Sequence, residues 1–309
     1  MAGATASALL SLLLLLAVAP LLPGVAARTR AFLTGRRGAP VYQLYADLWK
    51  LLRRGVVYST TTTAMFRLAP IAVATTVVLA AALLPLNGTS GMLRFSGDAL
   101  AFAYLLGLGR FLLVLGALDT GSSFEGMGAS REVAFASVVE MGLFFAIATV
   151  SVMTRELSLS GMFGAPLGGG GGSGVRAGPP LVMVAAGLFG LLLAECARVP
   201  VDDPHTHLEL TMIHEVMVLD HGGPDLALLL YAGAVKLAVM SALIVALLVP
   251  RAGWPLPLSL AALLAGMLAT GTAVGVVEAA TARLRLLKVP LYLAGAAAIA
   301  GFGLILVVR

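Results

Sequence analysis

Long apolar runs, separated by short polar segments, make up nearly the whole chain. A helix needs about 20 apolar residues to cross the roughly 30 Å of hydrocarbon in a bilayer. Eight runs come close to that length, at residues 5–26, 64–86, 100–118, 133–153, 180–197, 226–249, 256–278 and 289–308. The alternating pattern of a membrane barrel is absent, and backbone in lipid must form its hydrogen bonds internally. The sequence therefore predicts an all-α integral membrane protein with about eight transmembrane helices, a single polytopic domain over residues 1–309.

The densest polar sequence lies at residues 195–225, called the polar island below. It contains all four histidines and seven of the fifteen acidic residues of the chain. Asp203 followed by Pro204 is a favourable helix start, because Asp caps the first turn and Pro fits its first position. We expect a helix from Pro204 to about Leu219. Residues 198–225 are thus predicted to form a cytoplasmic polar loop with a short amphipathic helix.

The histidines of this predicted helix are not arranged to chelate an ion. His207 and His214 are seven residues apart on one stripe, about 10.5 Å along the helix axis. His205 would point to nearly the opposite side from His207. Because Zn²⁺ needs several ligands within roughly 2 Å, we predict no metal site and interpret the histidines as part of a polar docking face.

Lys and Arg are concentrated in alternate connections between the runs. If the amino terminus lies outside, the inner connections contain Arg28, Arg30, Arg36, Arg37, Lys50, Arg53, Arg54, Arg131, Arg198, Arg283, Arg285 and Lys288. The outer ends contain only Arg94, Arg155, Arg176, Arg251 and Arg309. Cytoplasmic loops of membrane proteins carry an excess of these residues. The sequence therefore predicts a multi-pass protein of the cell membrane with both termini outside and the polar island in the cytoplasm.

Composition and charge agree with this assignment. Hydrophobic residues make up 60% of the chain and charged residues 11%, with a mean hydropathy of +1.00. The net charge of +5 and the pI near 9.7 reflect membrane topology and contact with anionic lipid, and give no reason to expect nucleic-acid binding. The first run has no basic segment before it and a basic loop after it, so we expect it to remain as a transmembrane helix.

The single cysteine, Cys196, excludes several kinds of redox site. One thiol does not ligate an iron–sulfur cluster, form an internal disulfide or make a CxxC pair. The sequence also lacks a phosphate-binding P-loop and a dinucleotide fingerprint, and Gly128, in the segment at residues 128–132, is expected to turn the chain between two helices. If the chain serves redox chemistry, the electron carriers are expected in partner subunits.

Five ionisable residues lie within or at the ends of apolar runs: Arg110, Glu140, Glu195, Lys236 and Glu278. A charge at the centre of a membrane helix costs about 2.5–3.5 kcal/mol on insertion scales. Such residues are expected to face the protein interior or water. They either pair to fix helix packing or form a proton relay, and acids on several spans together with a lysine favour the relay.

The motif at residues 195–215, ECARVPVDDPHTHLELTMIHE, resembles the membrane subunit of formate hydrogenlyase and related membrane-bound (group 4) nickel–iron hydrogenases. That subunit is related to the quinone-site membrane subunit of respiratory complex I, the NADH-quinone oxidoreductase. Shorter pieces agree in order: RRG at 36–38, DLWKL at 47–51, LDTGS at 118–122, GASRE at 128–132 and ARLR at 282–285. The resemblance covers nearly the whole chain.

The resemblance also assigns individual residues. Arg131 and Glu140 match an arginine placed nine residues before an intramembrane glutamate in the complex I relatives. Glu195 and Arg198 match residues before a Val-Pro pair, and Glu209 matches the last acid of their quinone loop. Two earlier glutamates of that loop are His205 and His207 here. This difference favours the hydrogenase branch and makes quinone the less favoured ligand.

The resemblance implies a membrane-anchoring and ion-coupling subunit, itself without a redox centre, in an oxidoreductase complex. The relay residues would be Arg110, Arg131, Glu140, Glu195, Glu209, Lys236 and Glu278. A peripheral arm would dock on Arg36, Arg37, Arg198, Asp202, Asp203, His205, His207, His214 and Glu215. Expected partners are hydrogenase-like large and small subunits that carry iron–sulfur clusters and nickel–iron, and an antiporter-like membrane subunit; this chain is expected to bind no cofactor. His207 and His214 would join the relay by titrating near neutral pH.

Three alternatives remain open. The chain is a quinone-binding membrane subunit of an NADH-quinone oxidoreductase, a purely structural membrane anchor, or a free-standing secondary transporter. Transporters bind substrate near the midplane between broken helices, whereas the densest polar sequence here lies in a loop. Neutralising Glu140, Glu195 or Lys236 would abolish assembly if the chain were only an anchor.

Overall fold

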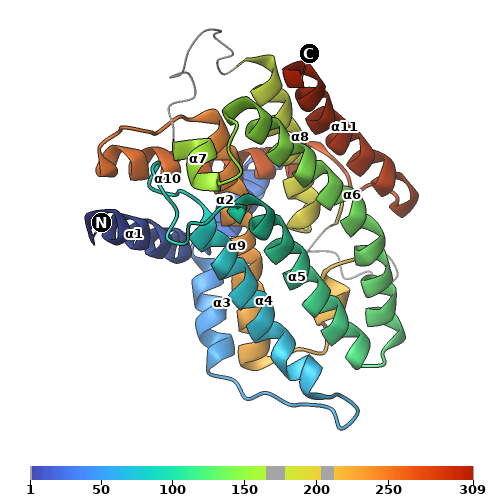
Figure 1. The fold of residues 1–309 in the computed structure, drawn as a ribbon. Coiled ribbons are helices and arrows are strands. Elements are labelled where there is room, and N and C mark those ends of the chain that lie inside the picture. The colour runs from blue at the N-terminus through green and yellow to red at the C-terminus, as the bar shows by residue number, and fades with distance from the viewer. Residues whose placement is uncertain (1, 165–177, 203–211, 309) are drawn as a thin grey trace.

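The computed structural model describes residues 2–164, 178–202 and 212–308. Within these residues the chain forms helices and connections only, in agreement with the predicted all-α class (Figure 1). The α-helices are α1 (Ala2–Val18), α2 (Leu21–Leu33), α3 (Gln43–Leu52), α4 (Ala64–Leu83), α5 (Asp98–Asp119), α6 (Ser123–Thr154), α7 (Leu159–Gly164), α8 (Pro179–Glu195), α9 (Gly223–Leu248), α10 (Leu256–Ala280) and α11 (Val289–Val308). Two short 3-10 helices are η1 (Glu215–Val218) and η2 (Leu286–Lys288).

All eight predicted apolar runs are helical, but eight complete spans is an approximate description. Six helices of the described chain are long and apolar enough to cross a membrane: α4, α5, α6, α9, α10 and η2–α11. The first run is divided into α1 and α2, which are bent by 43° and make a seventh span if counted together. Pro20, which has no amide hydrogen to donate, lies at this break. The 17 residues of α8 reach about 26 Å, slightly less than the hydrocarbon thickness.

Helix α9 is the centre of the bundle. Of its most apolar 18-residue window, 78% is buried inside the chain, the highest share among the candidate spans. It contacts α4, α10, α8 and α3, while α4 also packs along α5. Helix α11 packs against α6 and α8 on another side of the molecule, and α10 packs against α2. The buried position of α9 places its Lys236 among the other helices.

Small residues allow the closest helix contacts. A Cβ on Gly187 of α8 would lie 2.9 Å from the carbonyl oxygen of Ala296 and 2.9 Å from the Cβ of Ala300, both on α11. Such close backbone approach is typical of helix pairs in membranes, where packing replaces the hydrophobic drive for association.

One local prediction was wrong, and a second is contradicted in the part that the structure describes. Helix α6 begins at Ser123, ten residues before the predicted start at 133, so residues 128–132 are helical and do not turn the chain. The reason for Gly128 is packing, because a Cβ there would lie 2.2 Å from Cγ1 of Val216 in η1. The described part of the expected helix from Pro204 to Leu219 contains only η1, Glu215–Val218; residues 203–211 lie outside the described residues.

Candidate functional site

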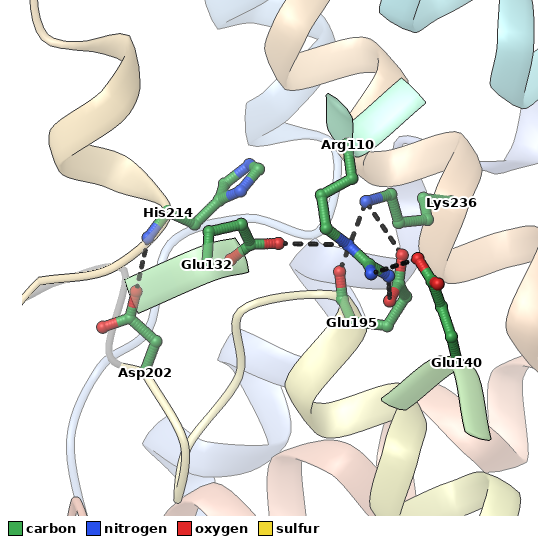
Figure 2. A network of polar contacts seen from close by, with 7 residues as sticks. All are labelled: Arg110, Glu132, Glu140, Glu195, Asp202, His214 and Lys236. Atoms are coloured by element: carbon green, nitrogen blue, oxygen red, sulfur yellow. Dashed lines mark hydrogen bonds and ion pairs between the residues drawn. The ribbon is translucent and has the colours of Figure 1, made fainter. Parts of the chain in front are cut away.

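Arg110 of α5 lies at the centre of a buried group of charges drawn from four helices (Figure 2). Its side chain is only 6% exposed. Nε lies 3.3 Å from Oε1 of Glu132, and a terminal nitrogen lies 3.0 Å from Oε1 of Glu140, both on α6. The other terminal nitrogen donates to Oε2 of Glu195 at the end of α8. Each nitrogen of the guanidinium group therefore faces a different carboxylate.

Lys236 completes this group, which we call the Arg110 cluster: Arg110, Glu132, Glu140, Glu195 and Lys236. The Nζ atom of Lys236 lies 3.2 Å from Oε1 of Glu195. Glu195 is therefore held between two cations, and its side chain is 3% exposed. The side chain of Glu140, in contrast, is 42% exposed on the surface of the bundle. The cluster thus connects the interior of the chain to its surface.

A small cavity lies between the Arg110 cluster and Asp202 and His214 of the polar island. Its polar lining comes from Arg110, Glu132, Glu195, Asp202 and His214. The space open to water-sized molecules is about 20 Å³, room for about one water. This cavity fits a water molecule between polar groups.

Asp202 fixes the described end of the polar island against the membrane helices. Its Oδ2 accepts hydrogen bonds from the backbone amides of Ile213 and His214, both at 3.1 Å. Its Oδ1 lies 2.8 Å from a guanidinium nitrogen of Arg283, in the connection after α10. Arg131 of α6 donates to the carbonyl oxygen of Met212 at 2.9 Å. These side chains bind the backbone groups that the expected α-helix would have paired internally, which explains its absence at residues 212–214.

Several residues predicted on the docking face lie inside the protein instead. Asp202 is 2% exposed, and Arg198 pairs with Glu278 of α10 at 3.5 Å. His214 is partly buried and lines the cavity. Arg36 and Arg37, after α2, are exposed, as the docking prediction requires.

The predicted titration of His214 near neutral pH was wrong. Desolvation by burial, helped by the positive charges of Lys236 and Arg110 and opposed by Glu195, lowers the pKa of His214 from 6.5 to about 4. The imidazole is therefore neutral at pH 7. It can orient a water molecule by hydrogen bonding, but it does not carry a positive charge there.

Of the predicted relay residues, the structure brings Arg110, Glu140, Glu195 and Lys236 together. Glu278 pairs with Arg198, and Arg131 binds the island backbone. Glu215 is partly buried at the start of η1. Asp203, His205, His207 and Glu209 lie outside the described residues. In the chain that the structure does describe, no group of three or more His, Cys, Asp or Glu is placed to hold a metal ion.

Glu132 is the cluster member that the sequence reasoning missed. It was assigned to a loop because the start of α6 was placed too late. A spacing of eight residues puts Glu132 and Glu140 on the same face of a helix, just over two turns apart. That spacing is the signal that would have found it.

Comparisons with known proteins agree with this fold. The sequence model of the NADH dehydrogenase family matches residues 6–308. Hydrogenase-4 component C of Escherichia coli is 33% identical over 263 residues, 85% of this chain and 81% of that protein. Formate hydrogenlyase subunit 4 of Escherichia coli is 36% identical over 152 residues, 49% of this chain and 50% of that protein. One subunit of the NADH-quinone oxidoreductase of Hyphomonas neptunium is 27% identical over 272 residues, covering 82% of this chain and 73% of that protein.

A solved structure shows the same fold. A chain of the membrane-bound sulfane sulfur reductase, an archaeal respiratory membrane complex, superimposes with a TM-score of 0.83 at 22% identity, covering 99% of both chains. The family model and the sequence relatives confirm the family resemblance found in the sequence. The protein is a multi-pass membrane protein that belongs to the NADH dehydrogenase family, together with membrane subunits of hydrogenase, formate hydrogenlyase and NADH-quinone oxidoreductase complexes.

Proposed function

We propose that this chain couples redox turnover in a peripheral arm to proton movement in the membrane, and that the Arg110 cluster carries the coupling. The observation that supports this most is the charge of the cluster. It contains three carboxylates and two cations, so with every group ionised it has a net charge of −1. The two cations balance the buried Glu132 and Glu195, so the excess negative charge lies with the partly exposed Glu140, and one bound proton makes the cluster neutral. The cluster can therefore exchange one proton without leaving a large uncompensated charge.

The positions of its members suggest a direction for the proton path. The cavity with room for about one water lies between His214 and the pair Glu132 and Glu195. Arg110 connects these acids to Glu140, whose carboxylate is 42% exposed. A proton would enter from the polar island, be shared among the acids around Arg110 and leave at Glu140. An antiporter-like membrane partner would receive it there, at the face formed by α5 and α6.

Asp202 gives the peripheral arm a way to act on the cluster. Its carboxylate accepts a hydrogen bond from the backbone amide of His214. Asp202 and His214 both line the cavity. A change of charge or position in the polar island during turnover would move these groups and so change the water between them and Glu132. Redox turnover in the peripheral arm would act near Glu209, in the same island. Movement of the loop would in this way alter the proton occupancy of the cluster.

The partners and cofactors are proposed from the relatives. A hydrogenase-like large and small subunit would dock on the cytoplasmic side of the membrane, at the polar island and the exposed Arg36 and Arg37. Iron–sulfur clusters and nickel–iron would belong to those subunits, and this chain would bind no redox centre of its own. Both termini would face the outside. The names of the hydrogenase and formate hydrogenlyase relatives support this assembly.

The test is Glu140→Gln in the assembled complex, reconstituted in sealed vesicles with a fluorescent pH indicator. We expect normal assembly and substrate turnover with reduced proton movement, because glutamine keeps the shape but does not bind a proton. Glu156→Gln, the same change at an exposed position before α7, is the matched control and should behave as wild type. An unchanged proton signal at normal turnover in Glu140→Gln would remove Glu140 from the path. Loss of assembly in that variant would favour the purely structural role.

A further inference from the structure

Helix α3 presents an aromatic and apolar stripe that no other part of the described chain covers. Tyr42, Trp49 and Leu52 recur at helical spacing and are 65%, 59% and 54% exposed. Helix α3 packs against α9 and α2 on its other side (Figure 1). The stripe therefore faces away from the bundle.

The contacts of α3 fix its depth relative to the bundle. At its carboxyl end, Gly55 meets the start of α9, since a Cβ on Gly223 would lie 2.7 Å from the Gly55 carbonyl oxygen. Near its amino end, Tyr45 donates to the carbonyl oxygen of Ala17, and Tyr231 of α9 donates to the neighbouring carbonyl oxygen at residue 16. Tyr231 is eight residues from Gly223, about 12 Å along the helix. Along the axis of α9, helix α3 thus extends from the level of Tyr231, about 12 Å from Gly223, to the end of the bundle that carries the polar island.

This depth corresponds to the membrane–water interface. The 26 residues of α9 span about 39 Å, which exceeds the roughly 30 Å of hydrocarbon by about 9 Å. The excess is comparable to the length of α9 that lies beside α3. With this excess at the Gly223 end of α9, the stripe on α3 lies at the level where lipid head groups meet acyl chains, where Trp and Tyr are enriched in membrane proteins.

Positive charge is concentrated at the end of α3 farther from the membrane centre. Lys50, Arg53 and Arg54 are exposed there. The guanidinium carbon of Arg53 lies 4.3 Å from the ring centroid of Trp49, so the charge is held next to the stripe. The acidic residue of α3 is Asp47, 3.7 Å from Lys50. Two arginines therefore remain in excess at the level of the lipid phosphates.

We propose that α3 is a binding surface for anionic phospholipids of the leaflet on the polar-island side. Arg53 and Arg54 bind the phosphate groups, and Trp49 and Tyr42 lie against the glycerol and upper acyl region. At this depth the basic end of α3 is complementary to an anionic head group, and the aromatic stripe is complementary to the upper acyl region. This combination favours a lipid over a soluble protein as the bound partner. Basic residues near an anionic membrane surface contribute about 1 kcal/mol each, which corresponds to about fivefold in affinity per residue.

The chain contains two tryptophans, Trp49 and Trp254, which allows a direct test. In a Trp254→Phe background, Trp49 is the sole tryptophan and reports on lipids that contact α3. The full chain is placed in phosphatidylcholine nanodiscs with increasing fractions of brominated phosphatidylglycerol or brominated phosphatidylcholine. We expect half-maximal quenching of Trp49 at a mole fraction at least about fivefold lower for the anionic lipid.

Charge variants identify the residues responsible. Arg53→Gln/Arg54→Gln should reduce the preference to near unity, whereas Arg285→Gln/Lys288→Gln, an equal loss of charge in the connection after α10, should leave it unchanged. Equal quenching by the two lipids overturns the proposal, as does a preference that survives Arg53→Gln/Arg54→Gln. Absence of quenching by either lipid also overturns it, and would mean that protein covers the stripe.

Discussion

Replacing Arg110 by methionine removes the cation that three carboxylates share. Arg110 is 6% exposed and contacts Glu132, Glu140 and Glu195. Breaking a buried ion pair by removing one partner costs about 3–5 kcal/mol, because the remaining charge is buried without compensation. Only Lys236 then remains opposite three carboxylates. We therefore expect a loss of at least about 3 kcal/mol in the free energy of unfolding.

The assay is denaturation of the purified chain in mixed detergent micelles, followed by circular dichroism, with Arg110→Met compared with wild type. The double variant Arg110→Met/Glu195→Gln should recover part of the loss, because it removes the carboxylate that Arg110 and Lys236 share. The coupling energy between the two positions should be at least about 1 kcal/mol, as expected for contacting groups. Stability equal to wild type in Arg110→Met, or strictly additive effects in the double variant, would refute the assignment of the cluster as a buried charge network.

Three further predictions concern the polar island and its supports. Asp202→Ala should increase amide hydrogen exchange at residues 212–218, because the amides of Ile213 and His214 lose their acceptor. Unchanged protection of these amides would contradict the role of Asp202 in holding this segment. His214→Gln should flatten the pH dependence of stability between about pH 6.5 and 4. The pKa of His214 is lowered to about 4 in the folded chain, so the wild type is most stable above about pH 6.5. As the pH falls from 6.5 to 4, the unfolded state is protonated at His214 before the folded state, and the wild type loses stability. The same dependence of melting temperature on pH in wild type and His214→Gln would argue against this. Gly128→Ala should destabilise by about 1–3 kcal/mol through its contact with η1, whereas Gly126→Ala, with open space around it, should be neutral or slightly stabilising; similar melting temperatures for the two variants would disprove the close approach.

The membrane helices were predictable because the length of an apolar run is set by the thickness of a bilayer. The break between α1 and α2 was not, because Pro20 lies inside an apolar run and proline is tolerated within membrane helices. The start of α6 was missed because Gly128, in the segment at residues 128–132, was interpreted as a turn residue. In the structure Gly128 allows η1 to pack closely against α6. This contact could not be predicted locally, because η1 lies more than 80 residues later in the chain.

The charged residues within the spans indicated a buried site, and four of them do meet. Their partners could not be assigned from the sequence, because each pair joins different helices. For the same reason, the burial of Asp202 and Arg198, which were predicted on the docking face, could not be recognised from the sequence. Charged residues next to a span are compatible with a docking face or with burial, and only the positions of Arg283 and Glu278 on the α10 side decide for burial.

The central claim is that the Arg110 cluster gains and loses a proton during turnover, and infrared difference spectroscopy of the assembled complex tests it most directly. We predict a carbonyl band of a protonated carboxylic acid that changes with turnover. This band should shift or vanish in Glu132→Gln, Glu140→Gln or Glu195→Gln and remain in Glu156→Gln. A turnover spectrum without such a band, or a band that is identical to wild type in all three cluster variants, would contradict the claim.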